Sequence, residues 1–313
     1  MSAHRPPPVP ALDALEDALA LLREHGPTGD AAPPAEPLPS LLERCEALVA
    51  EAASAGPEPL RTVHHFACSG GTLICRCIAA LPNTVLLSEI DPLSTNRTAE
   101  PGGARFAPTD LILQLRQSRH PVDPAMLVAV FRAGLDRLHG LLAAEGRHLV
   151  LRDHPHSRFC TDVDAAARPG LRDMLRPDHR LLSVVTVRHP LESFLSLEAA
   201  DWVHFSPATL EDYARRYHAF LDDHADLPVI RYEEFLADPE TVLSGICARL
   251  ALPFDRLALT LQAGLVLTGD SGRAGGTIAP RPRRPIPEPL RAQMTDSPSY
   301  EQLCTRLDYD PSG

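Results

Sequence analysis

The chain has 313 residues, of which 44% are hydrophobic, so it is long enough to bury one large core or two smaller ones. Its formal charge of −11 argues against the basic surface that neutralises nucleic-acid phosphates, and we expect no nucleic-acid partner. All 30 basic residues are Arg, because the sequence contains no Lys. The composition therefore excludes lysine Schiff-base chemistry and the ATP-binding loop G-x-x-x-x-G-K-[ST].

Cysteine usage and hydropathy indicate the compartment. The 7 cysteines are an odd number without a C-x-x-C pair, which is typical of a reducing environment. No apolar run approaches the roughly 20 residues that a membrane helix needs, and acidic residues stand where a secretory leader would be apolar. We expect a cytoplasmic protein without a membrane span. The pattern carries no information on the oligomeric state.

Residues 1–60 are predicted to be an N-terminal extension of an α/β domain that covers 61–313. Eleven of the 32 prolines fall in this extension, and the rest of it is rich in Ala and Glu, as expected for a segment without its own core. Helical periodicity predicts two short helices within it, at 12–24 and 41–53, the second opened by a capping box at Ser40.

From residue 61 onward, short β-branched or apolar runs alternate with amphipathic stretches, which predicts a mostly parallel sheet flanked by helices. Strands are expected at 62–67, 84–87, 148–152, 182–187 and 229–232. Helices are expected at 73–80, 109–118, 124–145, 191–200, 210–223, near 233, and at 239–250. After residue 267 the Gly-, Arg- and Pro-rich sequence predicts a long loop followed by a terminal helix, and such loops are usually functional.

The first chemical motif is the turn Ala67-Cys68-Ser69-Gly70-Gly71-Thr72 between a strand and a helix. Glycines let backbone amides turn toward a ligand, and a helix N-terminus favours an anion, so the turn has the form of a phosphate cradle. A plain tight turn explains these residues equally well. A nucleophilic Ser69 is disfavoured, because the G-x-S-x-G elbow would need Gly where Ala67 stands.

The second motif is Arg188-His189-Pro190 followed by Ser196, which starts at the carboxyl end of the fourth strand. Ligands bind at this edge of open α/β sheets, and an Arg fork with a hydroxyl suits a second phosphate. Each residue alone could simply cap a carboxylate or face solvent.

Together the motifs resemble the sulfotransferases that use 3′-phosphoadenosine 5′-phosphosulfate (PAPS), in which a strand-loop-helix motif holds the 5′-phosphosulfate and R-x-P-x-x-x-x-x-S holds the 3′-phosphate. The resemblance runs from about residue 62 to the end and includes 230–235, 238–240 and 250–254. It implies a sheet of P-loop nucleoside-kinase topology and sulfuryl transfer from PAPS to a hydroxyl or amine of a small molecule or carbohydrate, with no metal required. It implies donor contacts from Ser69, Gly70, Gly71, Thr72, Arg188 and Ser196.

The chain departs from the family at the first loop, where Cys68 or Ser69 replaces a Lys or Arg. Arg76, one turn into the next helix, is a candidate replacement because its side chain can reach back toward the loop. The stretch 271–276 resembles the family's late loop over the 3′-phosphate, with Arg273 as the predicted contact. Additional positive potential is expected from Arg281, Arg283 and Arg284.

Two residues are candidates for the general base. His154, after the third strand, resembles the base of the cytosolic sulfotransferases, and Glu89, after the second strand, resembles the Glu of carbohydrate- and tyrosine-sulfating relatives. We favour His154, because an imidazole pKa of about 6.5 suits proton acceptance, and His156 ranks third. Arg152 is predicted to stabilise charge on the transferred group.

Other clusters are less specific. His64, His65, Cys68, Cys75 and Cys77 match no standard zinc spacing, and we expect no metal site. Trp202, His204 and Phe205 are candidates for lining the acceptor pocket, and plain packing explains them equally well. Two rival functions stay open: a nucleotide-binding protein of this fold without activity, and a nucleotide kinase working without Lys.

Overall fold

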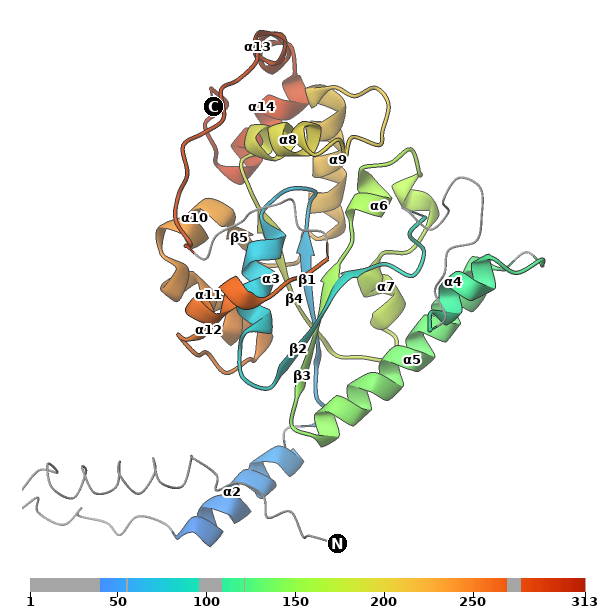
Figure 1. The fold of residues 1–313 in the computed structure, drawn as a ribbon, viewed down its shortest axis with the longest axis vertical. Coiled ribbons are helices and arrows are strands. Elements are labelled where there is room, and N and C mark those ends of the chain that lie inside the picture. Colours follow the sequence, from blue (N-terminus) through green and yellow to red (C-terminus); the bar gives the residue numbers. More distant parts are fainter. Residues whose placement is uncertain (1–39, 55, 96–108, 121, 269–276, 313) are drawn as a thin grey trace, which may run out of the picture. The chain divides into compact units, whose positions relative to one another are not determined.

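The computed structural model describes residues 40–54, 56–95, 109–120, 122–268 and 277–312 (Figure 1). Contacts divide the chain into two units, 1–56 and 57–313. The described part of the first unit is helix α2 (Leu41–Ser54). Ser40 and Glu43 form its capping box, because each backbone N–H donates to the other's side chain, at 2.6 and 3.2 Å. The helix predicted at 12–24 lies outside the described residues.

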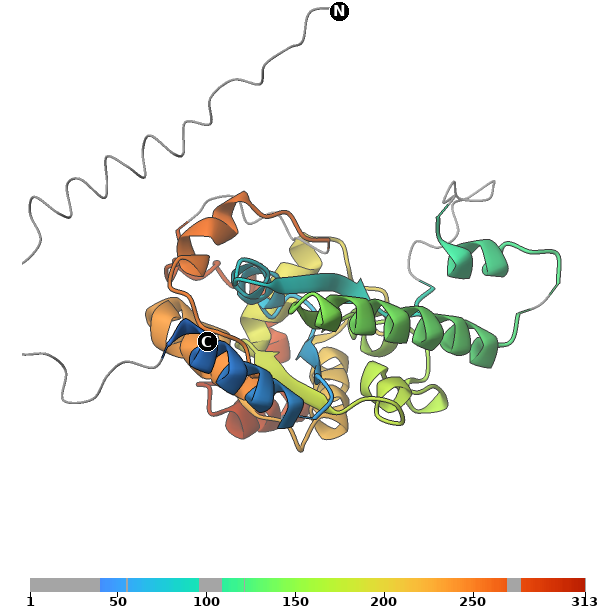
Figure 2. The ribbon, with the colours of Figure 1, turned by 90° about the horizontal axis from the view of Figure 1, so that it is seen from below.

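The second unit is built on a five-stranded sheet with the order β2-β3-β1-β4-β5, in which every neighbouring pair is parallel. The strands are β1 (Leu60–His65), β2 (Thr84–Ile90), β3 (His148–Asp153), β4 (Leu181–Val187) and β5 (Val229–Arg231). Each overlaps a predicted strand, and helices flank the sheet on both faces (Figure 1 and Figure 2). The predicted fold class is therefore confirmed.

The longer helices also agree with the prediction: α3 (Gly71–Ala79), α4 (Leu111–Arg116), α5 (Pro124–Ala144), α8 (Pro190–Ala199), α9 (Leu210–Asp223), α10 (Tyr232–Ala237) and α11 (Pro239–Leu250). The sequence did not predict the short pieces α6 (His156–Phe159), η1 (Ala165–Ala167), α7 (Leu171–Leu175), α12 (Ala258–Leu261) and η2 (Gln262–Gly264). These are too short to show a helical period. The chain ends in two helices rather than one, α13 (Glu288–Thr295) and α14 (Pro298–Leu307).

Helix starts follow local signals. Pro lies in the first turn of α5, α8, α11 and α14, and in each the preceding side chain accepts a hydrogen bond from a backbone N–H of the helix. Within the described ranges, no helix has both the length and the hydropathy of a bilayer span.

Strand alternation sends neighbouring polar residues to opposite faces of the sheet. One face packs against α3, α10 and α11, and the other packs its β1 and β3 side chains, Leu60 and Leu149 among them, against α5 and α7. His64 and Asp153 share the face of Leu60 and Leu149, whereas their chain neighbours point the other way. Two adjacent histidines of β1 therefore belong to different environments.

Candidate active site

A cavity of about 1130 Å³ opens at the carboxyl ends of the central strands. Its walls come from the glycine turn after β1, from the ends of β2 and β3, and from Arg188 after β4. This is the sheet edge at which open α/β proteins bind their ligands. The two phosphate motifs of the sequence therefore line one cavity.

The glycine turn leaves no room for side chains. Gly70 has φ +84°, and a Cβ there would lie 2.3 Å from Cδ2 of Tyr232. A Cβ at Gly71 would lie 2.5 Å from Cγ of His65. Gly70, Gly71 and Thr72 line the cavity together with Tyr232 and His65, so the N-terminus of α3 borders it.

Ser69 has a different place from the one its sequence position suggests. Its hydroxyl and its backbone N–H both donate to the Phe66 carbonyl, at 2.8 and 3.2 Å, and the residue is fully buried. Ser69 thus holds the shape of the turn. Ser69 also lines the cavity, together with Gly70, Gly71 and Thr72 of the predicted donor contacts.

Arg188 joins the two motifs. Its Nη1 donates to the Cys68 carbonyl at 3.3 Å and to Oγ of Ser196 at 3.1 Å. Its Nη2 donates to Glu192 at 3.1 Å, and the guanidinium lies 5.6 Å from the Tyr232 ring centroid. The predicted Arg188 and Ser196 pair is therefore assembled beside the glycine turn, while the carboxylate partner Glu192 was not predicted.

A further arginine approaches this pair from the C-terminal segment. Arg284 donates from Nη1 to the Leu195 carbonyl at 3.0 Å, next to Ser196, and its charge acts on the Cys68 thiol. Burial nevertheless raises the pKa of Cys68 to about 12, so this thiol stays protonated. Arg273 lies outside the described residues.

Arg152 is a second cation that contacts the turn, at Thr72. The guanidinium is buried and binds groups from four parts of the chain. Its partners are Oγ1 of Thr72 at 2.8 Å, Nε2 of His65 at 2.9 Å, Oγ of Ser88 at 3.0 Å, the Thr268 carbonyl at 2.8 Å and Oε1 of Glu89 at 2.8 Å. Arg76 lines the same cavity. The positive charge missing from the loop sequence is thus supplied by β3.

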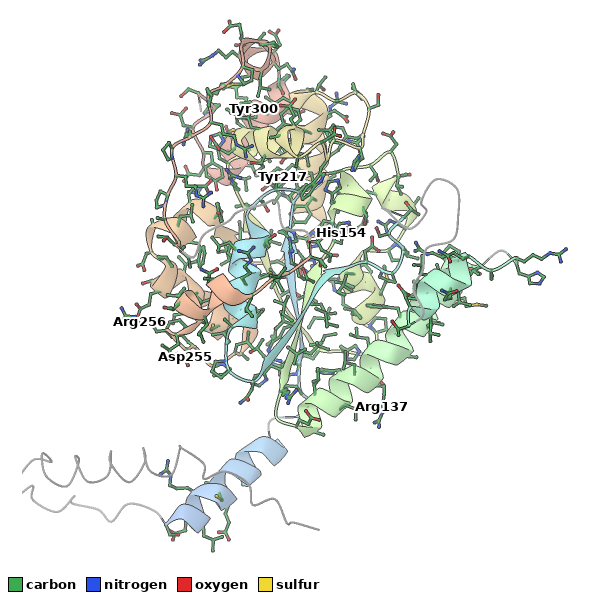
Figure 3. The ribbon with its side chains drawn as sticks, viewed as in Figure 1. Arg137, His154, Tyr217, Asp255, Arg256 and Tyr300 are labelled. Atoms are coloured by element: carbon green, nitrogen blue, oxygen red, sulfur yellow. The ribbon has the colours of Figure 1, made fainter. Side chains whose placement is uncertain are left out.

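The two candidate bases form one pair. Glu89 sits at a register shift in β2 with φ +59°, a conformation that turns its side chain toward β3. Its Oε2 accepts a hydrogen bond from Nδ1 of His154. His154 directly follows the carboxyl end of β3 and is labelled in Figure 3. Burial raises the pKa of Glu89, but the His154 hydrogen bond and the Arg152 charge outweigh it and lower that pKa to about 2.

An ionised Glu89 that accepts from Nδ1 holds the proton of His154 on that nitrogen, so Nε2 keeps its lone pair. The side chains that the sequence offered as alternatives therefore complement each other. His154 can take a proton at Nε2, and Glu89 can stabilise the imidazolium that results.

Aromatic and imidazole rings form the wall beyond His154. The ring centroid of His156 lies 6.0 Å from that of His154, 6.3 Å from Trp202 and 5.5 Å from His204. Burial, followed by the nearby His154, lowers the pKa of His156 to about 4, so His156 is neutral at pH 7. Phe205 is buried in the core, so packing is the correct interpretation for it.

Sequence reasoning missed several residues that shape this site. His65 follows from strand alternation, which directs it toward α3. Glu192 lies within the second motif, four residues after Arg188. Tyr232 and Thr268 line the cavity but lie far from both motifs in the sequence, so no local pattern indicates them. The five residues weighed for a metal do not assemble, since His64 lies on the opposite face and Cys75 and Cys77 are buried in the α3 core.

Residues 175–256 match the family model described as "Sulfotransferase family". The matched segment includes Arg188, Ser196 and the region after the last strand. This segment, about a quarter of the chain, is similar to the sulfotransferase family. The resemblance recognised from the two motifs is therefore confirmed.

Solved sulfotransferase structures are similar to this chain at low sequence identity. A sulfotransferase domain from the curacin biosynthetic pathway is 16% identical over 81% of this chain and 98% of its own, with a TM-score of 0.48. A sulfotransferase from Alicyclobacillus acidocaldarius is 15% identical over 82% and 98%, with a TM-score of 0.41. A mouse sulfotransferase complexed with PAP is 12% identical over 80% and 89%, with a TM-score of 0.37. No curated protein matches the chain.

Proposed function

We propose that the protein transfers a sulfuryl group from PAPS to a hydroxyl or amine of a small molecule or carbohydrate, and that it does so without a metal. One observation carries the proposal: the glycine turn and Arg188 line a single cavity and are joined by the hydrogen bond from Arg188 to the Cys68 carbonyl. A doubly phosphorylated adenosine needs two separate anion sites within one cleft. These two motifs supply them.

The donor's two ends would bind at different places. The N-terminal amides of α3 would hold the 5′-phosphosulfate, with Arg152 and Arg76 lining the same cavity. Arg188 and Ser196 would hold the 3′-phosphate, with Arg284 close by and Arg273 as a further predicted contact. The cations converge on the cavity although the chain as a whole carries a charge of −11.

The reaction would be an in-line displacement at sulfur. The acceptor oxygen or nitrogen attacks the sulfur as its proton passes to Nε2 of His154, and Glu89 stabilises the imidazolium. The bond from sulfur to the 5′-phosphate oxygen breaks, which leaves adenosine 3′,5′-bisphosphate. Arg152 touches both Thr72 of the turn and Glu89, so it lies where charge develops on the transferred group.

The experiment is incubation with labelled PAPS and a metabolite extract, followed by mass spectrometry for an added sulfuryl group. His154→Ala should lose turnover and bind adenosine 3′,5′-bisphosphate nearly as the wild type does, because His154 serves the acceptor. His120→Ala, at an exposed position outside the cavity, is the matched control. Turnover that survives His154→Ala but not Glu89→Ala would make Glu89 the base.

Two outcomes would favour the rival functions. Nucleotide binding without turnover across a broad acceptor panel would indicate a binding protein of this fold. Turnover that depends on magnesium and moves a phosphoryl group would indicate a kinase. The absence of Lys argues against a kinase, because the ATP-binding loop G-x-x-x-x-G-K-[ST] contains one.

A further inference from the structure

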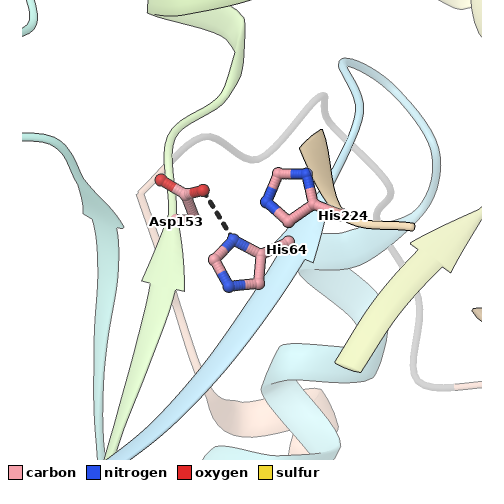
Figure 4. Close-up of side chains that lie close together, drawn as sticks. All are labelled: His64, Asp153 and His224. Atoms are coloured by element: carbon pink, nitrogen blue, oxygen red, sulfur yellow. Dashed lines mark hydrogen bonds and ion pairs between the residues drawn. The ribbon is translucent and has the colours of Figure 1, made fainter. Parts of the chain in front are cut away.

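A buried polar cluster lies behind the candidate active site, on the sheet face opposite His65 and Arg152. It consists of His64 from β1, Asp153 from the end of β3 and His224, the C-cap residue of α9 (Figure 4). One nitrogen or oxygen atom from each lies within 4.8 Å of the others, and all three residues are buried. The phosphate motifs do not account for these side chains.

The cluster is part of a hydrogen-bond chain that starts at the backbone of His154. The His154 N–H donates to Oδ1 of Asp153 at 2.8 Å, and Oδ2 of Asp153 lies 2.6 Å from Nδ1 of His64. Nε2 of His64 lies 2.8 Å from Oγ1 of Thr62, which lies 2.7 Å from Oγ of Ser183. The chain thus links three strands to the residue that we propose as the base.

His224 closes the cluster from the helical side. Its Nδ1 lies 2.8 Å from the Phe220 carbonyl, which can only accept, so Nδ1 carries the proton. Its ring centroid lies 4.5 Å from that of His64 and 4.6 Å from that of Phe220. The ring therefore shields the Asp153 and His64 contact from solvent.

The distances favour a shared proton over a metal ion. Two ligands of one tetrahedral zinc lie about 3.4 Å apart, given zinc bonds of about 2.1 Å. The 2.6 Å between His64 and Asp153 is a hydrogen-bond distance. These side chains are thus arranged to share one proton.

We propose that Asp153 is a positioning residue that holds the His154 backbone, as the neutral partner of His64, so that the imidazole faces Glu89. The proposal rests on the proposed function, since it assigns a task to the same base. With the proton on Asp153, the donors run from Oδ2 to His64, from His64 to Thr62, and from Thr62 to Ser183. The reverse order, from Ser183 toward an ionised Asp153, fits the same distances, so burial decides between the two. Oδ1 stays free to accept from His154.

Burial supports the neutral form. It raises the pKa of Asp153 to about 7 and lowers the pKa of His64 to about 3, because a charge on either group would be desolvated. Charged or titratable groups on the surrounding elements also act on the pair: Asp91, His154, Arg172, Arg176, Asp223, His224 and Asp226.

Asp153→Asn tests whether residue 153 works in its neutral form, because the Asn amide has the donor and acceptor pattern of a protonated carboxyl. Asp153→Asn should keep kcat within about threefold of the wild type, whereas Asp153→Ala should lower kcat by about 10- to 100-fold with the nucleotide Kd and acceptor KM unchanged. Asp136→Asn and Asp136→Ala, at an exposed position of α5 outside this network, are the matched controls and should leave kcat unchanged. An inactive Asp153→Asn, or a fully active Asp153→Ala, would overturn the proposal.

Two measurements do not depend on turnover. The infrared carbonyl stretch of a protonated carboxyl should be present in the wild type below pH 7 and absent from Asp153→Asn. This comparison does not depend on Asp153→Ala, which is the less stable variant. The His154 amide should exchange slowly with deuterium in both proteins and faster in Asp153→Ala. Absence of the carboxyl band, or one bound transition metal per chain, would overturn the proposal, whereas failed turnover with these signatures intact would overturn only the proposed function.

Discussion

Removal of the Arg188 side chain is the most direct test of the donor site. Arg188 links the second motif to the glycine turn through the Cys68 carbonyl, and it also holds Ser196. Arg188→Ala would remove the fork that we propose for the 3′-phosphate. It would also leave the Glu192 carboxylate without this partner, close to an incoming anion.

The expected loss of nucleotide-binding free energy depends on how exposed the Arg188 and Glu192 side chains are. A charged contact of this kind is worth about 2 to 5 kcal/mol when buried. The side chains of Arg188 and Glu192 are 20% and 12% exposed, so some screening by solvent places the loss in the lower half of that range. A loss of about 2 to 3 kcal/mol corresponds to a Kd that is roughly 30- to 150-fold weaker.

Calorimetric titration with adenosine 3′,5′-bisphosphate measures this change. Arg215→Ala is the matched control, because Arg215 forms the same type of pair with Glu211, at 3.2 Å and four residues apart, with 61% of the Arg side chain exposed. Arg188→Lys should recover only part of the affinity, since an ammonium keeps the charge without the fork. Equal affinities for Arg188→Ala and Arg215→Ala would remove Arg188 from the site.

Two further predictions concern stability. Gly70→Ala should lower the free energy of unfolding in urea by about 1 to 3 kcal/mol, because the new Cβ meets the Tyr232 ring at a positive φ. Gly134→Ala, where an added Cβ has nothing within 4 Å, should raise the free energy of unfolding by about 0.5 to 1 kcal/mol. Equal changes for the two variants would contradict the close contact between Gly70 and Tyr232. Asp153 has a folded pKa of about 7 against 3.8 for the free side chain, so its stabilising contribution is complete below pH 3.8 and is lost as the pH rises to 7. The wild type should therefore lose about 1.4 kcal/mol per pH unit relative to Asp153→Asn across that window, and a constant difference would show that Asp153 is ionised throughout.

Local signals explain why so much of the fold is predictable from the sequence. The strands and longer helices follow from hydrophobic period and from Pro after a capping side chain, features that lie within a few residues of each other. The two phosphate motifs are equally local: one is a strand-turn-helix junction, and the other places Arg188 and Ser196 around a single helix start. Short helices such as α6 and α7 cannot be predicted in this way, because a single turn is too short to show a hydrophobic period.

Only the tertiary structure decided how the candidate residues cooperate. The sequence presents Glu89 and His154 as alternatives, since 65 positions separate them, but parallel pairing of β2 with β3 brings them into one hydrogen-bonded pair. The same pairing sets Arg152 against the glycine turn, so the chain has a cation there although its loop lacks one. Strand order and register are properties of the whole sheet, and no single segment carries them.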